Sequence, residues 1–99
     1  MRDLEAIELS VDACLLRARM SAHWAVEIQL RQFMRDLSSA SFIAAKGDSS
    51  SPVLRKAQLV GTLLAAAERA NVDGDAILAA DLVRAARDLR AWYRLDDVD

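Results

Sequence analysis

The chain has one clear break in its helical pattern, the segment KGDSSSPV from Lys46 to Val53. Gly47 suits the C-terminal cap of a helix, because glycine adopts the left-handed backbone there without penalty. Ser51 suits an N-cap, and Pro52 suits the first helical position, where its missing N–H costs nothing. The break therefore divides the chain into a long N-terminal part and a C-terminal part that each need packing partners.

The composition favours helix on both sides of this break. Hydrophobic residues make up 54% of the 99 residues, yet only 5% are aromatic and nearly one residue in five is alanine. Alanine, leucine, arginine and glutamate form helices well, whereas the β-branched and aromatic residues that favour strands are sparse. Because a chain of this length forms one small domain, we expect a single all-α domain.

Apolar residues spaced three and four apart predict a small bundle of three helices. The first helix is expected over about 3–45, either continuous or broken near 38–41. A linker at 46–51 leads to a second helix over about 52–70 and a third over about 74–95. The last two, joined by a short turn, are expected to form an antiparallel helical hairpin beside the long N-terminal helix.

The same spacing predicts which side chains form the core. In the first helix the principal apolar stripe is Leu4, Ile7, Val11, Cys14, Leu15, Ala18, Ala22 and Ala25. In the second helix the stripe is Val53, Ala57, Val60, Leu64 and Ala67, broadened by Leu59 and Leu63. In the third helix the stripe is Leu78, Leu82, Ala85, Leu89 and Trp92.

A second apolar line lies on a different side of the first helix and consists of Leu9, Leu16, Met20 and Trp24. About 40 residues of unbroken helix would reach about 60 Å, against about 30 Å for helices of about 20 residues. The short hairpin therefore cannot cover both apolar lines of the first helix. Because an exposed apolar row is a poor surface for a monomer, we expect dimerisation to complete the bundle. Burial of this line by the third helix of the same chain is the alternative.

Charged residues flank the second apolar line. Arg17, Arg19, Glu27 and Arg31 are expected at the rim of an interface, where they would set the orientation of a partner. Glu27 and Arg31 have the spacing of an i,i+4 ion pair. His23 is expected to be solvated between Arg19 and Glu27. The predicted partner-binding residues are therefore Leu9, Leu16, Met20, Trp24, Arg17, Arg19, Glu27 and Arg31.

The segment NVDGDAILAADL, from Asn71 to Leu82, is open to three interpretations. A calcium loop of the EF-hand type needs a glycine at position 6 and a bidentate acid at position 12. Here those positions hold Ala76 and Leu82. A helix-turn-helix over 64–82 has apolar residues in suitable places and could use Asn71 at its left-handed turn position. Its recognition helix, however, would begin with two aspartates, which repel phosphates.

The third interpretation is a turn between two helices. Asp73 would be the N-cap of the last helix, and Val72 with Ile77 has the spacing of a hydrophobic staple. Nothing is missing for this arrangement, so we expect the segment to be structural. The helix-turn-helix stays as the alternative function.

Reactive side chains do not favour catalysis. Cys14 lies on the apolar stripe and is expected to be a small buried hydrophobe rather than a nucleophile. His23 lies in HWAVEIQ, which lacks the lysine and glycine that follow the histidine in the HxxKG pattern of phosphotransfer domains. One cysteine and one histidine cannot form a metal cluster of the usual spacing. We therefore expect no enzyme, no cofactor, no metal and no small-molecule substrate.

The charge balance also narrows the choice of partners. Thirteen lysines and arginines against fifteen acids give a net charge of −2, which provides no electrostatic reason to bind nucleic acid or an anionic membrane. No apolar run approaches the ~18 residues that span a bilayer, and MRDLEAIELS lacks the apolar segment of a signal peptide. A lone cysteine cannot form an internal disulfide, which fits a reducing cytoplasm.

Together these features predict a small cytoplasmic protein–protein interaction module. It would act as a regulator, inhibitor, adaptor or assembly subunit by presenting a helical apolar face to a protein partner, to a second copy of itself, or to both. The alternative is a helix-turn-helix DNA-binding regulator that uses the 64–82 region.

Overall fold

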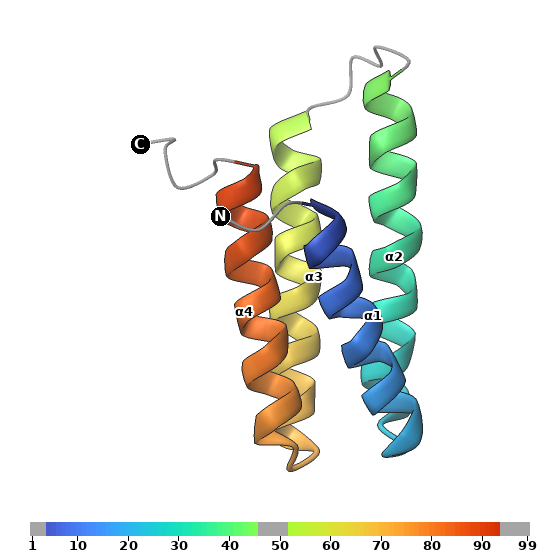
Figure 1. The fold of residues 1–99 in the computed structure, drawn as a ribbon, viewed down its shortest axis with the longest axis vertical. Coiled ribbons are helices and arrows are strands. Elements are labelled where there is room, and N and C mark those ends of the chain that lie inside the picture. The colour runs from blue at the N-terminus through green and yellow to red at the C-terminus, as the bar shows by residue number, and fades with distance from the viewer. Residues whose placement is uncertain (1–3, 46–51, 94–99) are drawn as a thin grey trace.

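The computed structural model describes residues 4–45 and 52–93, with side chains described for 4–38 and 56–93. These residues form four helices and no strand (Figure 1). The helices are α1 (Leu4–Met20), α2 (Trp24–Ala45), α3 (Pro52–Val72) and α4 (Ala76–Trp92). The predicted all-α architecture is confirmed, whereas the predicted count of three helices is wrong.

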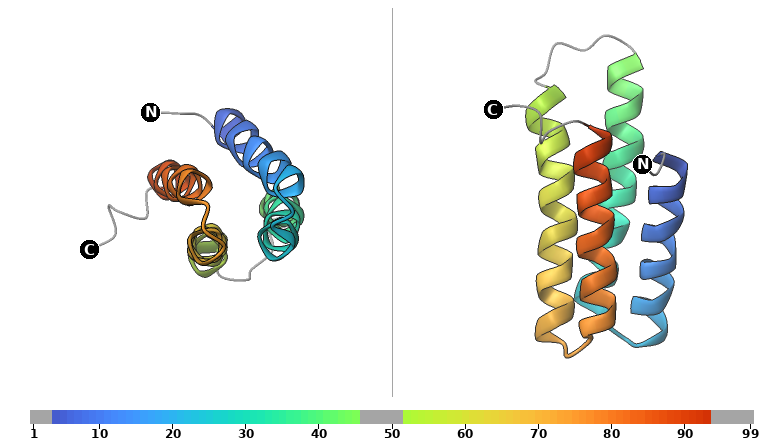
Figure 2. Two further views of the ribbon diagram at one scale, coloured as in Figure 1. Left: turned by 90° about the horizontal axis from the view of Figure 1, so that it is seen from below. Right: turned by 60° about the vertical axis from the view of Figure 1, so that its left-hand side comes forward.

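The helices form an antiparallel bundle in which each runs opposite to the next along the chain (Figure 1). The α1–α2 turn and the α3–α4 turn lie at the same end of the bundle (Figure 2). Each helix packs against its neighbours in sequence, and α1 also packs against α4. The first and last helices therefore close the bundle around one core.

The predicted long N-terminal helix is interrupted at Ser21–His23, a point that the sequence analysis missed. Ala22 has a positive φ of 58°. The N–H of His23 donates to the carbonyl of Ala18 (2.8 Å), and that of Ala22 donates to the carbonyl of Arg19 (3.2 Å). This pair of bonds around a left-handed residue is the Schellman motif that ends helices. The chain reverses there, so α2 packs back against α1.

The α3–α4 turn repeats the same motif. Asp75 N–H donates to the carbonyl of Ala70 (2.9 Å), and Gly74 N–H donates to that of Asn71 (3.0 Å). Gly74, with φ 87°, holds the left-handed position. Asn71, which the helix-turn-helix interpretation would place at that position, instead lies inside α3. The two turns are therefore structurally equivalent, with alanine in one at the place where the other has glycine.

Ala22→Gly is expected to raise the free energy of unfolding by about 0.5–1 kcal/mol, because glycine adopts positive φ without the Cβ penalty. The greater freedom of glycine in the unfolded chain offsets part of this gain. Gly74→Ala should lower the same quantity by about 1 kcal/mol. A Cβ at Gly74 would meet no atom within 4 Å, so backbone strain alone would cause the loss. Urea denaturation measures both changes, and a destabilised Ala22→Gly protein would contradict the assignment.

Several predicted helix boundaries also need correction. The backbone of α2 continues through residues 38–41 without the alternative break, and the linker at 46–51 lies outside the described residues. Helix α3 begins at Pro52 as expected, whereas α4 begins at Ala76. Asp75, not Asp73, caps α4 by accepting the N–H of Leu78 (3.0 Å). Val72 and Ile77 are both exposed, so the proposed hydrophobic staple is absent.

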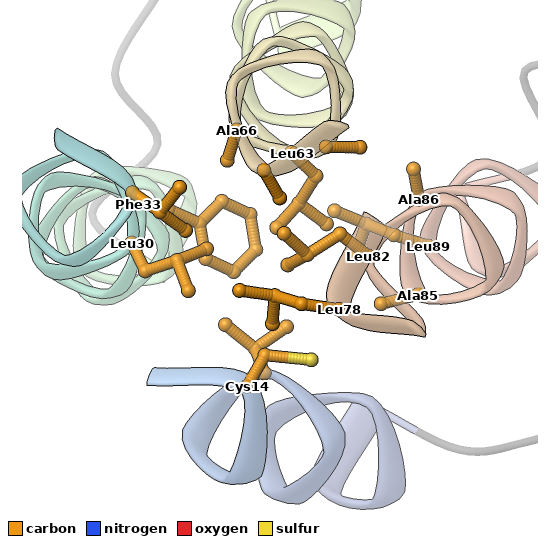
Figure 3. Close-up of a cluster of buried hydrophobic side chains, with 14 of the residues drawn as sticks. Cys14, Leu30, Phe33, Leu63, Ala66, Leu78, Leu82, Ala85, Ala86 and Leu89 are labelled. Atoms are coloured by element: carbon orange, nitrogen blue, oxygen red, sulfur yellow. The ribbon is translucent and has the colours of Figure 1, made fainter. Parts of the chain in front are cut away.

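The core lies between the four helices and is filled mainly by leucine, alanine and one phenylalanine (Figure 3). In the part of α2 up to residue 38, the buried apolar side chains are Val26, Leu30, Phe33 and Leu37, a stripe that becomes regular once the helix starts at Trp24. The buried side chains of the other helices are Ile7, Val11, Cys14, Ala18, Leu59, Val60, Leu63, Ala66, Ala67, Ala70, Leu78, Ala79, Leu82, Ala85, Ala86 and Leu89.

Four residues expected in the core are instead exposed: Ala22, Ala57, Leu64 and Trp92. Ala22 lies in the α1–α2 turn. In α3 the buried stripe is centred on Leu59, Leu63, Ala66 and Ala70, which turns Leu64 away. Among the described helices none is long and apolar enough to cross a bilayer.

Candidate protein-interaction surface

The second apolar line is exposed to solvent. Leu9, Leu16, Met20 and Trp24 are 64%, 58%, 80% and 61% exposed. The alternative in which the last helix of the same chain buries this line is therefore wrong. The side chains lie outside a core that is already closed by other residues.

The position of this line follows from the geometry of α1. Ile7, Val11 and Cys14 face the core, and Leu9 and Leu16 lie on the opposite side of the helix because 3.6 residues complete one turn. Met20 is the last residue of α1, and Trp24 is the first residue of α2. Ile28, one turn after Trp24, is also exposed. Ile28 was not among the predicted partner-binding residues, although it repeats the four-residue step from Met20 to Trp24.

Three of the predicted rim residues form one ion-pair group. Glu27 Oε1 accepts a hydrogen bond from Arg31 Nη2 (3.0 Å) and lies 3.4 Å from Arg19 Nε. The i,i+4 pair between Glu27 and Arg31 is confirmed. The carboxylate of Glu27 is largely buried, whereas both arginine side chains remain more than half exposed. Arg19 and Arg31 therefore still present N–H donors beside the start of α2.

Arg17, the fourth predicted rim residue, makes its contact within the chain. Its Nε and Nη2 donate to Asp75 Oδ2 and Oδ1, both at 3.1 Å. This bidentate pair joins α1 to the N-cap of α4. The hydrogen bond from Arg17, followed by the one from the Leu78 N–H, lowers the pKa of the Asp75 carboxyl below its ordinary value. Both favour the charged form of the carboxylate.

His23 lies between two aspartates of the other turn rather than in solvent between Arg19 and Glu27, so that expectation is wrong. Its Nε2 is 3.3 Å from Asp75 Oδ2, and its Nδ1 is 3.6 Å from Asp73 Oδ2. Asp73 also pairs with Arg69 at 3.3 Å. We call Arg17, His23, Asp73 and Asp75 the turn-end cluster. It holds the two equivalent turns together, which gives Asp73 and Asp75 a structural role.

The turn-end cluster is not a metal site as it stands. Its histidine directs one ring nitrogen to each aspartate, so a single ion could not replace both contacts. Within 4–38 and 56–93, no group of three or more His, Cys, Asp or Glu side chains is arranged so that it could hold a metal ion.

Cys14 is buried between α1 and α4, as expected. It contributes to a shallow groove that also includes Arg17, Asp81 and Arg84. Burial first, and the charge of Asp81 second, raise the pKa of the Cys14 thiol to about 11. Because the thiolate is the nucleophile, this groove holds a poorly reactive sulfur.

The region that could form a helix-turn-helix has a different geometry. Helices α3 and α4 lie antiparallel, side by side along their length (Figures 1 and 2), whereas the two helices of that motif cross at about 90–120°. The carboxylate of Asp75 stands at the N-terminus of α4, where a recognition helix would approach phosphates.

Comparison of the chain with protein-family models, with curated proteins and with solved structures finds no match. The second apolar line and its charged neighbours are therefore the features on which a functional interpretation depends.

Proposed function

We propose that this protein is a small non-enzymatic protein–protein interaction module, a regulator, inhibitor, adaptor or assembly subunit. It works by burying the second apolar line against another protein. The observation that carries this proposal is the exposure of Leu9, Leu16, Met20 and Trp24 on a chain whose core is formed by other side chains.

The physical reason is the cost of leaving these side chains in water. Fully burying a leucine or methionine contributes about 1.5–3 kcal/mol, and tryptophan is the residue most often found as a central anchor of interfaces. Met20 adds a flexible side chain that adapts to a partner surface. Arg19 and Arg31 lie beside this line with exposed guanidinium groups, as polar residues do at the rim of an interface.

The location that agrees best with this function is the cytoplasm, because Cys14 is a free, buried thiol and reducing compartments keep thiols in that form.

The test is site-specific photo-crosslinking in the cells that make the protein. A photoreactive residue replaces Leu16 in one variant and Ile77 in a matched control, since both positions are exposed apolar sites on helices. Abundant adducts at position 16 and few at position 77 are expected. Equal labelling at the two positions, or no protein adduct at position 16, would overturn the proposal.

A further inference from the structure

We infer, building on the proposed function, that the partner of Leu9, Leu16 and Met20, the part of the second apolar line that lies on α1, is a second copy of this chain. In this dimer the two α1 helices lie antiparallel across a two-fold axis. Three features of α1 support it: the spacing of its exposed small and large residues, their alternation, and the order of the charges beside them.

The outer side of α1 carries a seam of Ala6, Leu9, Ala13, Leu16 and Met20, which we call the α1 seam. Its steps of three, four, three and four residues are those that keep one side of a helix facing a partner helix. The α1 seam lies opposite the buried side of α1, formed by Ile7, Val11, Cys14 and Ala18. A shallow groove lined in part by Leu9, Ala13 and Leu16 follows it, and such hollows receive side chains of a facing helix.

The alternation of residue size favours the antiparallel orientation. With Leu9 opposite Met20 of the second copy, Ala13 lies opposite Leu16 of the second copy, so the small side chain of Ala13 meets a large one. No layer of the antiparallel pair then has alanine on both sides, which avoids a gap between the helices. In a parallel pair Ala13 would face Ala13 and Leu16 would face Leu16, which alternates gaps with crowded layers.

The charges beside the α1 seam favour the same orientation. Asp12 and Arg19 are seven residues apart, so they lie on the same edge of the seam. In the antiparallel register, Asp12 of each copy lies near Arg19 of the other, which gives two opposite-charge pairs. Arg19 has five N–H donors and uses Nε on Glu27. A parallel pair would instead direct Asp12 towards Arg17, which is already held by Asp75.

A two-fold dimer needs one surface that is complementary to itself, and the edge with Asp12 and Arg19 meets this condition. In this register residues 9–20 of the two α1 helices lie opposite each other, so the contact is about 18 Å long. A contact of this length between two helices buries less surface than the roughly 800 Å² per partner of a standard stable interface. The dimer should therefore be reversible and should depend on protein concentration.

Cysteine crosslinking tests the orientation. Leu9 and Met20 are about 16 Å apart along α1, well beyond the Cα separation of about 4.4–6.8 Å that a disulfide spans. We expect a mixture of Leu9→Cys and Met20→Cys proteins to form a disulfide-linked dimer in a glutathione redox buffer, and each variant alone to stay largely uncrosslinked. Crosslinking of each variant with itself would overturn the antiparallel arrangement. The wild-type protein, whose only cysteine is buried, is the control for crosslinking through Cys14.

Light scattering tests the dimer itself. At high micromolar concentration the wild-type mass should rise from 10.9 kDa towards twice that value. Leu9→Glu should stay monomeric, whereas Ile77→Glu should behave as wild type, since Leu9 and Ile77 are both 64% exposed. Circular dichroism checks that both variants are folded. A wild-type protein that stays monomeric, or equal masses for the two variants, would overturn the inference.

The outcomes separate this inference from the proposed function. If the protein is monomeric and its photo-adducts at position 16 contain a different polypeptide, the inference of a homodimer is wrong. The proposal of a protein–protein interaction module is then still supported. The absence of any adduct at position 16 would overturn the interaction module as well.

Discussion

Phe33→Ala is expected to lower the free energy of unfolding by about 3–5 kcal/mol, the range for removing a buried aromatic ring. Phe33 is 0% exposed, and its ring lies between α2 and the side chains of α3 and α4, close to Leu30 and Leu63 (Figure 3). The substitution removes the contacts of the ring and leaves a cavity, because helices held on both sides cannot close the space. Domains of this size have a free energy of unfolding of about 5–15 kcal/mol, so the substitution would remove a large part of the stability of the fold. Urea denaturation measures the loss.

The matched control is Ile28→Ala on the same helix. Ile28 is exposed, and substitutions of exposed residues usually change stability by less than about 0.5 kcal/mol. Similar decreases in the free energy of unfolding for Phe33→Ala and Ile28→Ala would contradict the burial of Phe33 in a closed core.

Asp75→Ala is expected to lower the free energy of unfolding by about 1–2 kcal/mol, mainly through loss of the N-cap of α4. The same substitution removes the acceptor of Arg17 and a partner of His23. Asp75→Asn is the matched variant, because asparagine caps helices about as well as aspartate but carries no charge. Its free energy of unfolding should fall less than that of the alanine variant. The decrease that Asp75→Asn still shows measures the contribution of the charged contacts.

The same residue makes stability depend on pH. The folded-state pKa of Asp75 is lowered, first by the hydrogen bond from Arg17 and then by the Leu78 N–H. A carboxyl with a lowered folded-state pKa contributes stability that is complete above its unfolded pKa of about 3.9 and is lost as the pH falls through the folded value. The free energy of unfolding should therefore fall more steeply below about pH 4 in wild type than in Asp75→Asn. Equal slopes between pH 5 and 3 in urea titrations would contradict this assignment.

Much of the fold could be predicted from local spacing. The stripe of α4 is buried from Leu78 to Leu89, Cys14 is buried, and α3 begins at Pro52. These features depend on helical periodicity and on the fixed φ of proline, which act within a few residues. Periodicity could not show the register of the second turn. Gly74 takes the left-handed position there, which moves the N-cap from Asp73 to Asp75.

The break at Ser21–His23 could not be predicted from residue type, because alanine normally favours a helix. Ala22 adopts positive φ in a turn whose partner turn has glycine at that place. The expected length of the first helix did indicate a break. A helix of about 60 Å beside helices of about 30 Å is resolved by folding the long helix in half. A second chain is not needed for that purpose.

Part of the candidate surface could be predicted and part could not. Leu9 and Leu16 lie opposite a buried stripe that the spacing reveals, so their exposure follows from helix geometry. The contacts of the turn-end cluster join Arg17 and His23 to aspartates at least 50 residues away. No local pattern reports such contacts, because they depend on both turns lying at one end of the bundle.

The contact between the first and last helices has a consequence for the growing polypeptide. The core-facing side of α1 is covered in part by α4, and α4 is the last described helix to leave the ribosome. Until then, Ile7, Val11 and Cys14 lack the leucines of α4 as neighbours. The nascent chain therefore exposes this apolar side of α1 until α4 has emerged.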